Sequence, residues 1–471
     1  MKSLMWFRND LRMDDNPALR GACIESDEVH AIYIFSSIQN NFHNDANCKI
    51  EFLIENLKIL DHELTKINIP LTIIDSTGFK DNKDIILNLI KERSINKVFW
   101  NNQFGNDEQN RDDQVTISLK KNDIEFSSYH EKVIFSPGSI RTGEDKPYSV
   151  FTPFKKKWIE NFNLDLLDIE FNYLIKNKTS IESNVIDFNF KYERSHSVDM
   201  SLWPPGEAHA KDRLELYLSK NILRYSQDRN DPILDGTSRI SPYLANGIIS
   251  PKRCILEALK KNNFELDTGE KGITKWIDEI IWREFYKNIM FCFPKVSQNK
   301  PFQDYTNNIK WRYEESELNA WKNGNTGFPI IDSAMKQLKS EGWMHNRLRM
   351  VVAMFFTKNM LHDWRLGEEF FMQNLIDGDF SSNNGGWQWS SSTGTDAAPY
   401  FRIFNPLTQS KNFDGEGLFI KKYLRELQDV DKKEIHDPSI ETRNSCNYPN
   451  QILDLKESRL RAIEAFNNAK N

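Results

Sequence analysis

Apolar and polar residues alternate in blocks over the first 130 residues of the chain. Short apolar runs at residues 4–7, 30–35, 71–74 and 97–100 are typical of buried strands. Between these runs, apolar residues recur with helical spacing at residues 50–67, and a weaker helical pattern covers residues 84–93. The alternation predicts an α/β domain built on a doubly wound parallel sheet. Residues 8–12, after the first run, lack the Gly-rich dinucleotide fingerprint, so we expect no standard pyrophosphate site there.

The pattern changes further along the chain. Residues 131–200 are irregular and contain several Pro, Asn and Ser residues, which is typical of an interdomain linker. Helical spacing dominates from residue 208 to about residue 375 and returns at residues 457–469, with no convincing strand alternation. We therefore predict an α/β domain over residues 1–130, a linker over residues 131–200 and an all-α domain over residues 201–471.

The composition is that of a globular protein. The 471 residues are 39% hydrophobic and 12% aromatic, which is enough for a sizeable core. No run approaches the roughly 20 apolar residues of a membrane span, and the charged residues near the start argue against a secretory signal. The five cysteines are scattered without metal or redox spacing, so we expect a cytoplasmic protein with no metal site.

Charge is distributed unevenly along the chain. The net charge of −6 argues weakly against a nucleic-acid partner, but residues 271–365 hold 15 Lys and Arg against 10 Asp and Glu. A basic region inside an acidic chain fits a surface that binds a polyanion. Taken alone, a random fluctuation in charge is the better interpretation.

The segment at residues 385–406, GGWQWSSSTGTDAAPYFRIFNP, combines aromatic side chains, a Gly pair and a turn rich in Ser and Thr. It has no clean period of 2 or 3.6 residues, so we expect a long loop rather than a helix or strand. Such loops often carry function. A buried loop held by its own side chains is an equally good interpretation of the composition.

Residues 276–293 predict a helix with two distinct faces. One face is an apolar stripe formed by Ile277, Ile281, Phe285 and Ile289. The other carries a carboxylate, an aromatic plate, a guanidinium and a phenol: Glu279, Trp282, Arg283 and Tyr286. The second face could contact bases and phosphate, but an amphipathic helix with a Glu279–Arg283 surface pair is favoured by this pattern alone.

Residues 326–350 predict two helices separated by a Gly. Asn346 can present an amide to a base edge and Arg347 can bind a phosphate. The simpler interpretation is a helix junction with a solvated basic edge. The nearby His345 has no second His or Cys close in sequence that would suggest a metal site.

Residues 235–247, DGTSRISPYLANG, group hydroxyl side chains around Arg239 at the predicted start of a helix. Hydroxyls and a guanidinium in this arrangement can hold a phosphate. A helix N-cap followed by a Pro-containing turn is the alternative. No arrangement in the sequence suggests a covalent nucleophile.

Taken together and in order, these segments resemble the photolyase/cryptochrome family. The resemblance runs from WFRNDLRMDDNPAL (residues 6–19) through DGTSRIS, WREFY, TGFPIIDSAMKQL, GWMHNRLRM and DGDFSSNNGGWQW to TGTDAAPYFRIFNP, which is nearly the whole chain. Within the family the sequence is most similar to bacterial class I cyclobutane pyrimidine dimer photolyases. The resemblance implies a Rossmann-like α/β antenna domain and an all-α domain that binds FAD in a U shape.

The resemblance also implies an activity, that of a carbon–carbon lyase which repairs DNA in the light. Photoexcited FADH⁻ would donate an electron to a flipped-out cyclobutane pyrimidine dimer, which splits into two pyrimidines and returns the electron. The partner would be UV-damaged DNA, single- or double-stranded, and the protein a monomer. Two alternatives within the family are a cryptochrome-like photoreceptor and a (6-4) photolyase. The lack of a long C-terminal extension and the presence of Asn346 and Met350, where the (6-4) branch has a His-containing pocket, favour dimer repair.

Each family motif assigns residues to the site. The residues implied to bind FAD are Tyr225, Thr237, Ser238, Arg239, Ile240, Ser241, Trp276, Asn346, Asp377, Gly378, Asp379 and Asn383, with Asn383 against flavin N5. The residues implied to contact the lesion or the DNA are Arg229, Glu279, Trp282, Arg283, Asn346, Arg347, Met350, Trp389 and Arg402. Trp387, Trp364 and Trp311 match the tryptophans that relay electrons to oxidised flavin, and Glu279 would hydrogen-bond the lesion.

The antenna site departs from the family pattern. His43, Asp107 and Glu108 match positions that contact 5,10-methenyltetrahydrofolate, the antenna that the resemblance implies. However, Asp107 stands where Asn is familiar and Gln298 where Lys is familiar. These departures lower the folate affinity that we expect and leave a deazaflavin antenna or an empty site as alternatives.

Overall fold

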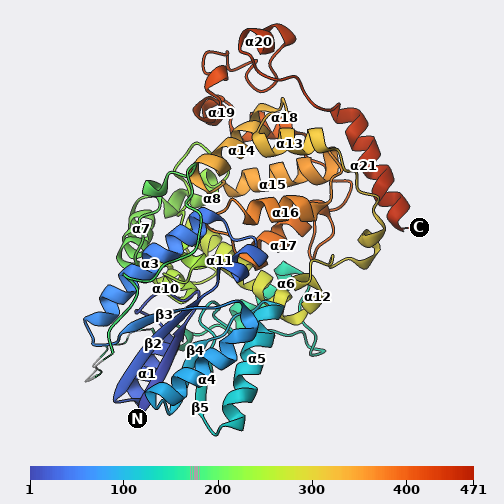
Figure 1. The fold of residues 1–471 in the computed structure, drawn as a ribbon. Coiled ribbons are helices and arrows are strands. Elements are labelled where there is room, and N and C mark those ends of the chain that lie inside the picture. Colours follow the sequence, from blue (N-terminus) through green and yellow to red (C-terminus); the bar gives the residue numbers. More distant parts are fainter. Residues whose placement is uncertain (170, 172, 174–178, 180, 471) are drawn as a thin grey trace.

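A computed structural model of the chain describes residues 1–169, 171, 173, 179 and 181–470, and Figure 1 shows its fold. A part of the predicted linker lies outside the described residues. In the described part of the chain, every helix is too short or too polar to cross a membrane.

The N-terminal region is built on one parallel five-stranded sheet with the strand order β3-β2-β1-β4-β5. The strands are β1 (Lys2–Phe7), β2 (Glu28–Phe35), β3 (Leu71–Asp75), β4 (Lys97–Asn101) and β5 (Glu125–Tyr129). The four predicted strands and the doubly wound sheet are confirmed. The sequence did not reveal β5, because this edge strand, EFSSY, is polar and lacks a fully buried residue.

Helices cover both faces of the sheet. Met5 and Phe7 of β1 pack in one apolar cluster with residues of α1 (Pro17–Glu25) and α3 (Asn47–Thr65). Leu4 and Trp6 point the other way, into a cluster with residues of α4 (Asn82–Arg93) and α5 (Asn106–Lys121). The strand is therefore apolar on both sides, as expected for a parallel sheet between two helical layers.

The predicted linker contains more regular structure than its composition indicates. Helix α6 (Phe151–Asn161) lies within it and packs against α11 (Lys271–Cys292). Phe151, Phe154 and Trp158 are buried on one side of α6. The expectation of an irregular segment is therefore wrong for these eleven residues, since the apolar positions of α6 are buried by a distant helix.

The region from residue 201 onward is helical, and in its described residues, 201–470, it contains no strand. Its first helices are α7 (Glu207–Lys220), α8 (Tyr225–Asp228), α9 (Ser241–Ala245), α10 (Pro251–Lys261), α11 and α12 (Pro294–Ser297). The middle helices are α13 (Glu315–Asn323), α14 (Pro329–Glu341), α15 (Asn346–Met354), α16 (Trp364–Met372) and α17 (Phe380–Ser391). The last are α18 (Pro406–Phe413), α19 (Leu418–Tyr423), α20 (Ile440–Ser445) and α21 (Leu455–Lys470); the short α2 (Ser37–Phe42) belongs to the N-terminal region. The all-α class of this region is confirmed.

The segment at residues 385–406 is not one long loop. Its first part belongs to α17, which is capped by Asp379 at its start and ends at Ser392 in the left-handed conformation, with a φ of 61°. A Cβ atom on Gly385 would lie 2.3 Å from the ring of Tyr286, so this glycine lets α17 approach α11 closely. Because small residues take the place of large apolar ones at this contact, the sequence lacks the helical spacing of apolar residues from which α17 could have been predicted. Residues 393–405 do form an irregular loop.

Candidate functional site

A cavity of about 490 Å³ opens in the helical region between α8, α11, α15 and α17. These helices pack against one another, α11 on α8 and α17, and α15 on α17 (Figure 1). The predicted cofactor residues that line it are Tyr225, Thr237, Ser238, Arg239, Ile240, Ser241, Trp276, Asn346, Asp377, Asp379 and Asn383. Gly378 lines instead a second, interdomain cavity. We call the first of these the central cavity.

Hydroxyl groups and a guanidinium gather at one end of the central cavity. The indole of Trp276 donates a hydrogen bond to Ser238 Oγ (3.3 Å) and that of Trp343 donates to Ser241 Oγ (3.2 Å). Arg239 lies over the Trp343 ring at 4.8 Å and donates to Glu341 Oε2 at 3.4 Å. This end can therefore offer hydroxyl and guanidinium donors to an anionic group.

Glu279 and Arg229 form an ion pair on the wall of the same cavity. Arg229 Nη1 lies 2.5 Å from Glu279 Oε1. Burial alone would lower the pKa of Arg229, but the Glu279 carboxylate raises it above its ordinary value. The favoured interpretation of the helix pattern, a surface pair between Glu279 and Arg283, is therefore wrong, because Glu279 turns to α8.

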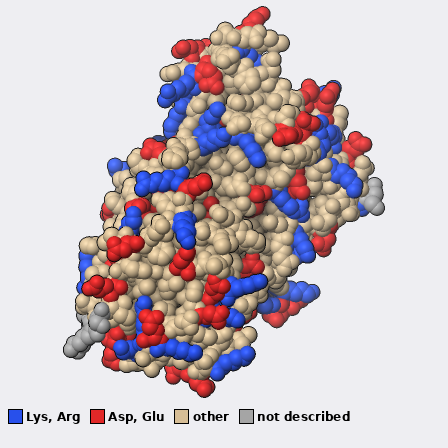
Figure 2. All heavy atoms as spheres, in the orientation of Figure 1, with Lys and Arg blue, Asp and Glu red and all other residues tan. Residues whose placement is uncertain are grey.

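A basic groove adjoins this ion pair on the outside. Arg229 and Arg347 line it together with Ser226, Asn230, Lys271, Thr274, Lys275 and Asp278. Arg347 is fixed by hydrogen bonds from its Nε and Nη2 to Asn230 Oδ1, at 3.2 and 2.7 Å. Among the lining residues, four are cations, Arg229, Lys271, Lys275 and Arg347, and one is a carboxylate, Asp278. Over the face drawn in Figure 2, acidic and basic side chains are interspersed.

Two tryptophan plates line the central cavity, Trp282 from α11 and Trp389 from α17, together with Met350. The Trp282 ring stacks on Phe151, with 3.6 Å between ring centroids and 8° between their planes. The Trp389 carbonyl accepts a hydrogen bond from the backbone N–H of Ala398. The Trp282 ring is thus supported by another ring, and the backbone of Trp389 is tied to the loop after α17.

Asn383 faces the central cavity from α17. Its Nδ2 donates to the carbonyl and to Oε1 of Glu368, both at 2.9 Å. Burial raises the pKa of Glu368 to about 7, against the effect of this hydrogen bond. With its donor group engaged, Asn383 retains its carbonyl oxygen as an acceptor for an N–H in the cavity.

The three predicted relay tryptophans lie in or against one apolar cluster. Trp387 lines the central cavity and, like Trp364, is buried, whereas Trp311 is partly exposed at the edge of the cluster. Rings that contact Trp387 in the described structure are those of Trp321, Phe356 and Phe371, with centroid distances of 6.2, 5.7 and 5.0 Å. The cluster joins the cavity to the surface, and Trp321 is an aromatic neighbour that the motifs did not indicate.

Two predicted DNA contacts lie away from the basic groove. The side chain of Arg283 is 11% exposed and turns inward, where it donates to the carbonyls of Lys132 (2.8 Å) and Leu244 (3.0 Å). Arg283 thus lies on the lining of the central cavity with its guanidinium bonded to the protein, and its contact with the DNA stays a prediction. Arg402 is exposed on the loop after α17 and lines neither the groove nor the central cavity.

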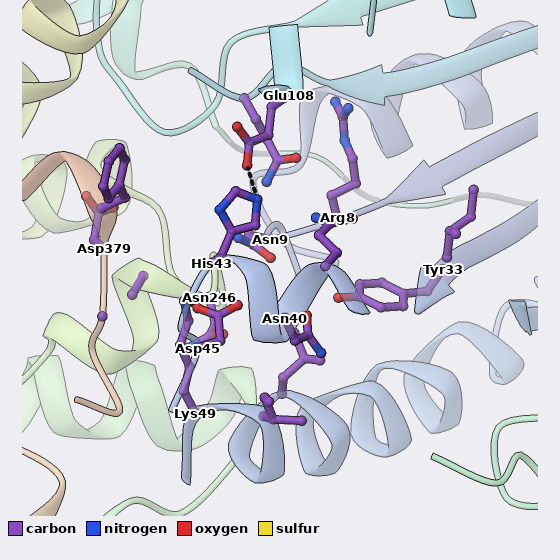
Figure 3. A pocket seen from close by; sticks show the side chains of 18 of the residues that line it. Arg8, Asn9, Tyr33, Asn40, His43, Asp45, Lys49, Glu108, Asn246 and Asp379 are labelled. Carbon is purple, nitrogen blue, oxygen red and sulfur yellow. Dashed lines mark hydrogen bonds and ion pairs between the residues drawn. The ribbon is translucent and has the colours of Figure 1, made fainter. Parts of the chain in front are cut away.

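The interdomain cavity lies between the sheet region and the helical region. Its inner part, about 150 Å³, is lined by Arg8, Asn9, Tyr33 and Asn246, and its outer part, about 500 Å³, by Asp107 and Gln298. Both parts reach His43, Glu108 and Asp379. In Figure 3 the His43 and Glu108 side chains point toward one another, with 3.7 Å between His43 Nε2 and Glu108 Oε1. The three predicted antenna residues are thus brought together.

Asp379 lies on the lining of both cavities. Lys287 Nζ lies 2.6 Å from its Oδ2, and Arg283 Nη2 lies 3.9 Å away. Burial alone would raise the pKa of Asp379, but the charges of Lys287 and Arg283 hold it well below its usual value. A carboxylate kept ionised by buried cations therefore separates the two sites and also caps α17.

Several site residues were not predicted. Arg349 donates to both carboxylate oxygens of Asp377 (3.0 and 2.8 Å) on the lining of the central cavity, and Trp343 holds Ser241. The position of Arg349 three residues after Asn346 on a helix could have indicated a shared face. Phe151 carries no such signal, because it reaches Trp282 from another part of the chain.

Comparison with known proteins agrees with these features. The family model "DNA photolyase" matches residues 3–170, and "FAD binding domain of DNA photolyase" matches residues 276–468. The Escherichia coli protein named deoxyribodipyrimidine photo-lyase is 39% identical over 99% of this chain and 98% of its own length.

Two solved structures share the whole fold. A class III photolyase from Agrobacterium tumefaciens is 29% identical with a TM-score of 0.87, covering 100% of this chain and 98% of its own. An archaeal photolyase from Sulfolobus tokodaii, described with two FAD molecules and a novel light-harvesting cofactor, is 28% identical with a TM-score of 0.82. The Sulfolobus structure covers 99% of this chain, and the match extends over 100% of the Sulfolobus chain. By fold, by the lining of its central cavity and by sequence over its full length, this chain belongs to the DNA photolyase family.

Proposed function

We propose that this protein repairs cyclobutane pyrimidine dimers in DNA with light and FAD. One observation carries the proposal furthest. A single cavity holds the Glu279–Arg229 ion pair, two tryptophan plates and Asn383, and a basic groove adjoins it. A nucleotide cofactor and a pair of bases need these chemically different surfaces side by side.

The residues present fit FAD. The hydroxyls of Thr237, Ser238 and Ser241 with the Arg239 guanidinium suit its phosphates, and Trp276 and Asn383 suit its rings. When bound, reduced and excited by light, FAD supplies the electron that opens a cyclobutane ring and accepts it back, so that no redox co-substrate is needed. Asn383 uses its amide nitrogen to bond Glu368, so its carbonyl oxygen is free to accept a hydrogen bond. It would accept that bond from the N–H of the reduced ring.

The chain's own residues would bind and orient the lesion. Trp282 and Trp389 would pack on the two flipped bases, where aromatic stacking offsets part of the cost of leaving the duplex. Glu279 would accept hydrogen bonds from the base edges, and its ion pair with Arg229 holds the carboxylate in place. Asn346 and Met350 would complete the pocket.

The basic groove would hold the DNA backbone beside the lesion. Arg229, Arg347, Lys271 and Lys275 supply cations along it, and Arg402 would add one from the loop. Binding should therefore weaken steeply as salt is raised. Because one chain contributes every residue of this site, we propose that it acts as a monomer.

We further propose that Trp387, Trp364 and Trp311 reduce oxidised FAD under illumination. Trp387 lines the cavity, and all three lie in or against the apolar cluster that extends to the surface. Each tryptophan also fills space in that cluster, so its packing role and its redox role have to be separated by experiment.

The interdomain cavity would hold the antenna, for which we propose 5,10-methenyltetrahydrofolate. Glu108 and His43 would bind its ring, and Asp107 and Gln298 line the outer part where its tail would lie. A second flavin, as described for the Sulfolobus protein, is the competing ligand. The near-UV absorption of the purified protein and the mass of the released chromophore distinguish folate, flavin and an empty site.

Illumination of the reduced protein with dimer-containing DNA tests the main proposal. We expect dimers to disappear in the light and to persist in a dark control. Persistence of the dimers despite bound, reduced FAD would contradict dimer repair. Repair of DNA carrying the (6-4) photoproduct instead would support that branch of the family, and repair of neither lesion would favour a photoreceptor.

A further inference from the structure

The loop between α17 and α18, residues 392–405, follows directly on Trp389 and carries Arg402. Its Phe401 side chain is 57% exposed, so the tip of the loop faces solvent. Backbone groups of an irregular segment need partners outside regular secondary structure. The contacts that fix this loop therefore also influence the position of Trp389, which precedes it.

A buried lysine holds the loop from beneath. Lys358 lies on the π-helical turn Phe355–Asn359, and no part of its side chain is accessible. Its Nζ donates to Ser392 Oγ at 2.7 Å and to the Arg402 carbonyl at 3.2 Å. The carbonyls of Pro399 and Tyr400 lie at 3.4 Å each. One ammonium thus joins both ends of the loop segment from Ser392 to Arg402.

The loop is connected in turn to both tryptophan plates. Ser392 Oγ donates to the Ala398 carbonyl, and the Ala398 N–H donates to the Trp389 carbonyl at 3.2 Å. On its other side, Asp396 Oδ2 accepts from the backbone N–H of Phe151 at 3.1 Å. Phe151 is the residue whose ring supports Trp282.

A second hydrogen bond ties the same two segments together. Thr395 Oγ1 donates to the carbonyl of Ser149, two residues before Phe151. The start of α6 is therefore joined to the loop at two points, and the stacked pair of Phe151 and Trp282 follows from that junction.

Stability does not account for Lys358. Among the described residues no carboxylate lies within ion-pair distance of it. Burial lowers its pKa to about 7, and the positive charge of Arg402 acts in the same direction. A buried charge without a counter-charge costs free energy, and an apolar side chain of similar volume would avoid that cost. The ammonium offers what an apolar side chain cannot, several donors aimed at the loop.

We propose that Lys358 is a positioning residue, which fixes the loop at residues 392–402 and through it the two tryptophan plates of the lesion pocket. The role of the plates rests on the proposed function, whereas the fixing of the loop does not. Lys358 lines neither the central cavity nor the basic groove. Besides the loop, its Nζ faces only the Phe466 ring of α21 among the described contacts, at 5.8 Å, so the loop is its route to the lesion pocket.

The test compares Lys358→Met with Thr357→Val in the full-length, FAD-loaded protein. Thr357 is a fully buried neighbour on the same turn, and its hydroxyl bonds to Ala353 rather than to the loop. Tryptic cleavage after Arg402 reports on the loop, and the dissociation constant for dimer-containing DNA reports on the plates. We expect Lys358→Met to accelerate cleavage and to weaken binding, each about tenfold, as the loss of hydrogen bonds from a charged donor implies. Flavin content and the midpoint of thermal unfolding should match those of Thr357→Val.

Unchanged cleavage and binding in Lys358→Met would overturn the proposal. Loss of FAD or of folded protein would also overturn it, since Lys358 would then be a general structural residue. Phe151→Leu independently tests the support of Trp282. We expect weaker binding of dimer-containing DNA with unchanged cleavage after Arg402. Unaltered binding would show that Phe151 does not position Trp282. If the wild-type protein shows no preference for dimer-containing DNA, the proposed function fails while the cleavage comparison still decides whether Lys358 fixes the loop.

Discussion

The central cavity and the interdomain cavity meet at Asp379 but differ in how their polar groups are paired. In the central cavity the pairs Arg229–Glu279, Arg349–Asp377 and Asn383–Glu368 are already formed. In the outer interdomain cavity, the buried His43 Nε2 has no hydrogen-bond partner, and its contact with Glu108 spans 3.7 Å. A site whose groups are fixed in advance is specific for one ligand geometry. At His43 and Glu108 the interdomain cavity lacks that constraint, although its Lys287–Asp379 pair is formed.

The same difference is visible in the sequence. The residues of the central cavity fall within unbroken family motifs, whereas Asp107 and Gln298 of the interdomain cavity depart from the family pattern. Paired groups restrict substitution, because removing one member leaves its partner buried and unsatisfied. Unpaired groups can change with the ligand. The flavin site is therefore expected to be the common property of these proteins and the antenna site the variable one.

Removal of Asp379 should break both sites at once and is the largest effect that we predict. Asp379→Ala leaves Lys287 buried without its counter-ion, which should lower the free energy of unfolding by about 3–5 kcal/mol. Because the pKa of Asp379 is lowered in the folded protein, its contribution is present at neutral pH and is lost as the pH falls below about 4. Denaturant unfolding across this range should show the wild type and the variant converging in acid.

Asp363→Ala is the matched control for this variant. Asp363 also caps a helix, α16, but its ion pair with Arg365 is partly exposed. Its removal should cost about 1 kcal/mol and leave FAD bound. Equal losses in the two variants would contradict the view that Asp379 holds the two sites together.

Trp387→Phe should abolish photoreduction of oxidised flavin while leaving repair by chemically reduced protein intact. The substitution keeps an aromatic ring in the cluster but removes the indole that lines the cavity. Flavin absorbance during illumination and a repair assay under reducing conditions measure the two properties. Trp321→Phe, a change in the neighbouring ring, serves as the control, and the same loss there would show that the relay has been assigned to the wrong residues.

Glu279→Ala should separate lesion chemistry from cofactor binding within the central cavity. Repair yield should fall about 10- to 100-fold, since hydrogen bonds to a charged group contribute about 1.5–3 kcal/mol. Flavin content, measured by absorbance after gel filtration, should stay unchanged, because the Arg239 end of the cavity is unaltered. A parallel loss of flavin would mean that Glu279 shapes the whole cavity.

Gln298→Lys tests the interdomain cavity, and its effect on ligand binding should be the smallest that we predict. A lysine at the outer interdomain cavity would restore the familiar cation and should raise folate retention a few-fold, as one added ion pair implies. The ratio of near-UV to flavin absorbance measures it. Flavin content and repair in blue light should not change, and a change in either would show that the two cavities are coupled beyond Asp379.

The sequence predicts the architecture well because its strongest patterns are local. The runs that became β1 to β4 and the period of α3 are decided by which residues are buried nearby. It failed at β5 and α17, where polar or small residues are accommodated by distant packing, as Gly385 shows against Tyr286. Pattern reasoning therefore locates elements but not the contacts between them.

The same limit applies to the site. The family motifs assigned the residues of the central cavity to one site. They did not show that Glu279 pairs with Arg229 or that Arg283 turns inward. Lys358 and Phe151 carry no motif signal, since their roles depend on partners about 40 and 130 residues away. Such residues become visible only when the fold is known.

The action spectrum of repair is the most direct measurement of whether one cavity joins flavin and lesion. Protein stripped of antenna and carrying only reduced FAD would be illuminated at successive wavelengths with dimer-containing DNA. We expect repair per absorbed photon to stay constant, so that the rate follows the absorption of the reduced flavin. Absence of repair, or a rate that does not follow the flavin spectrum, would contradict it.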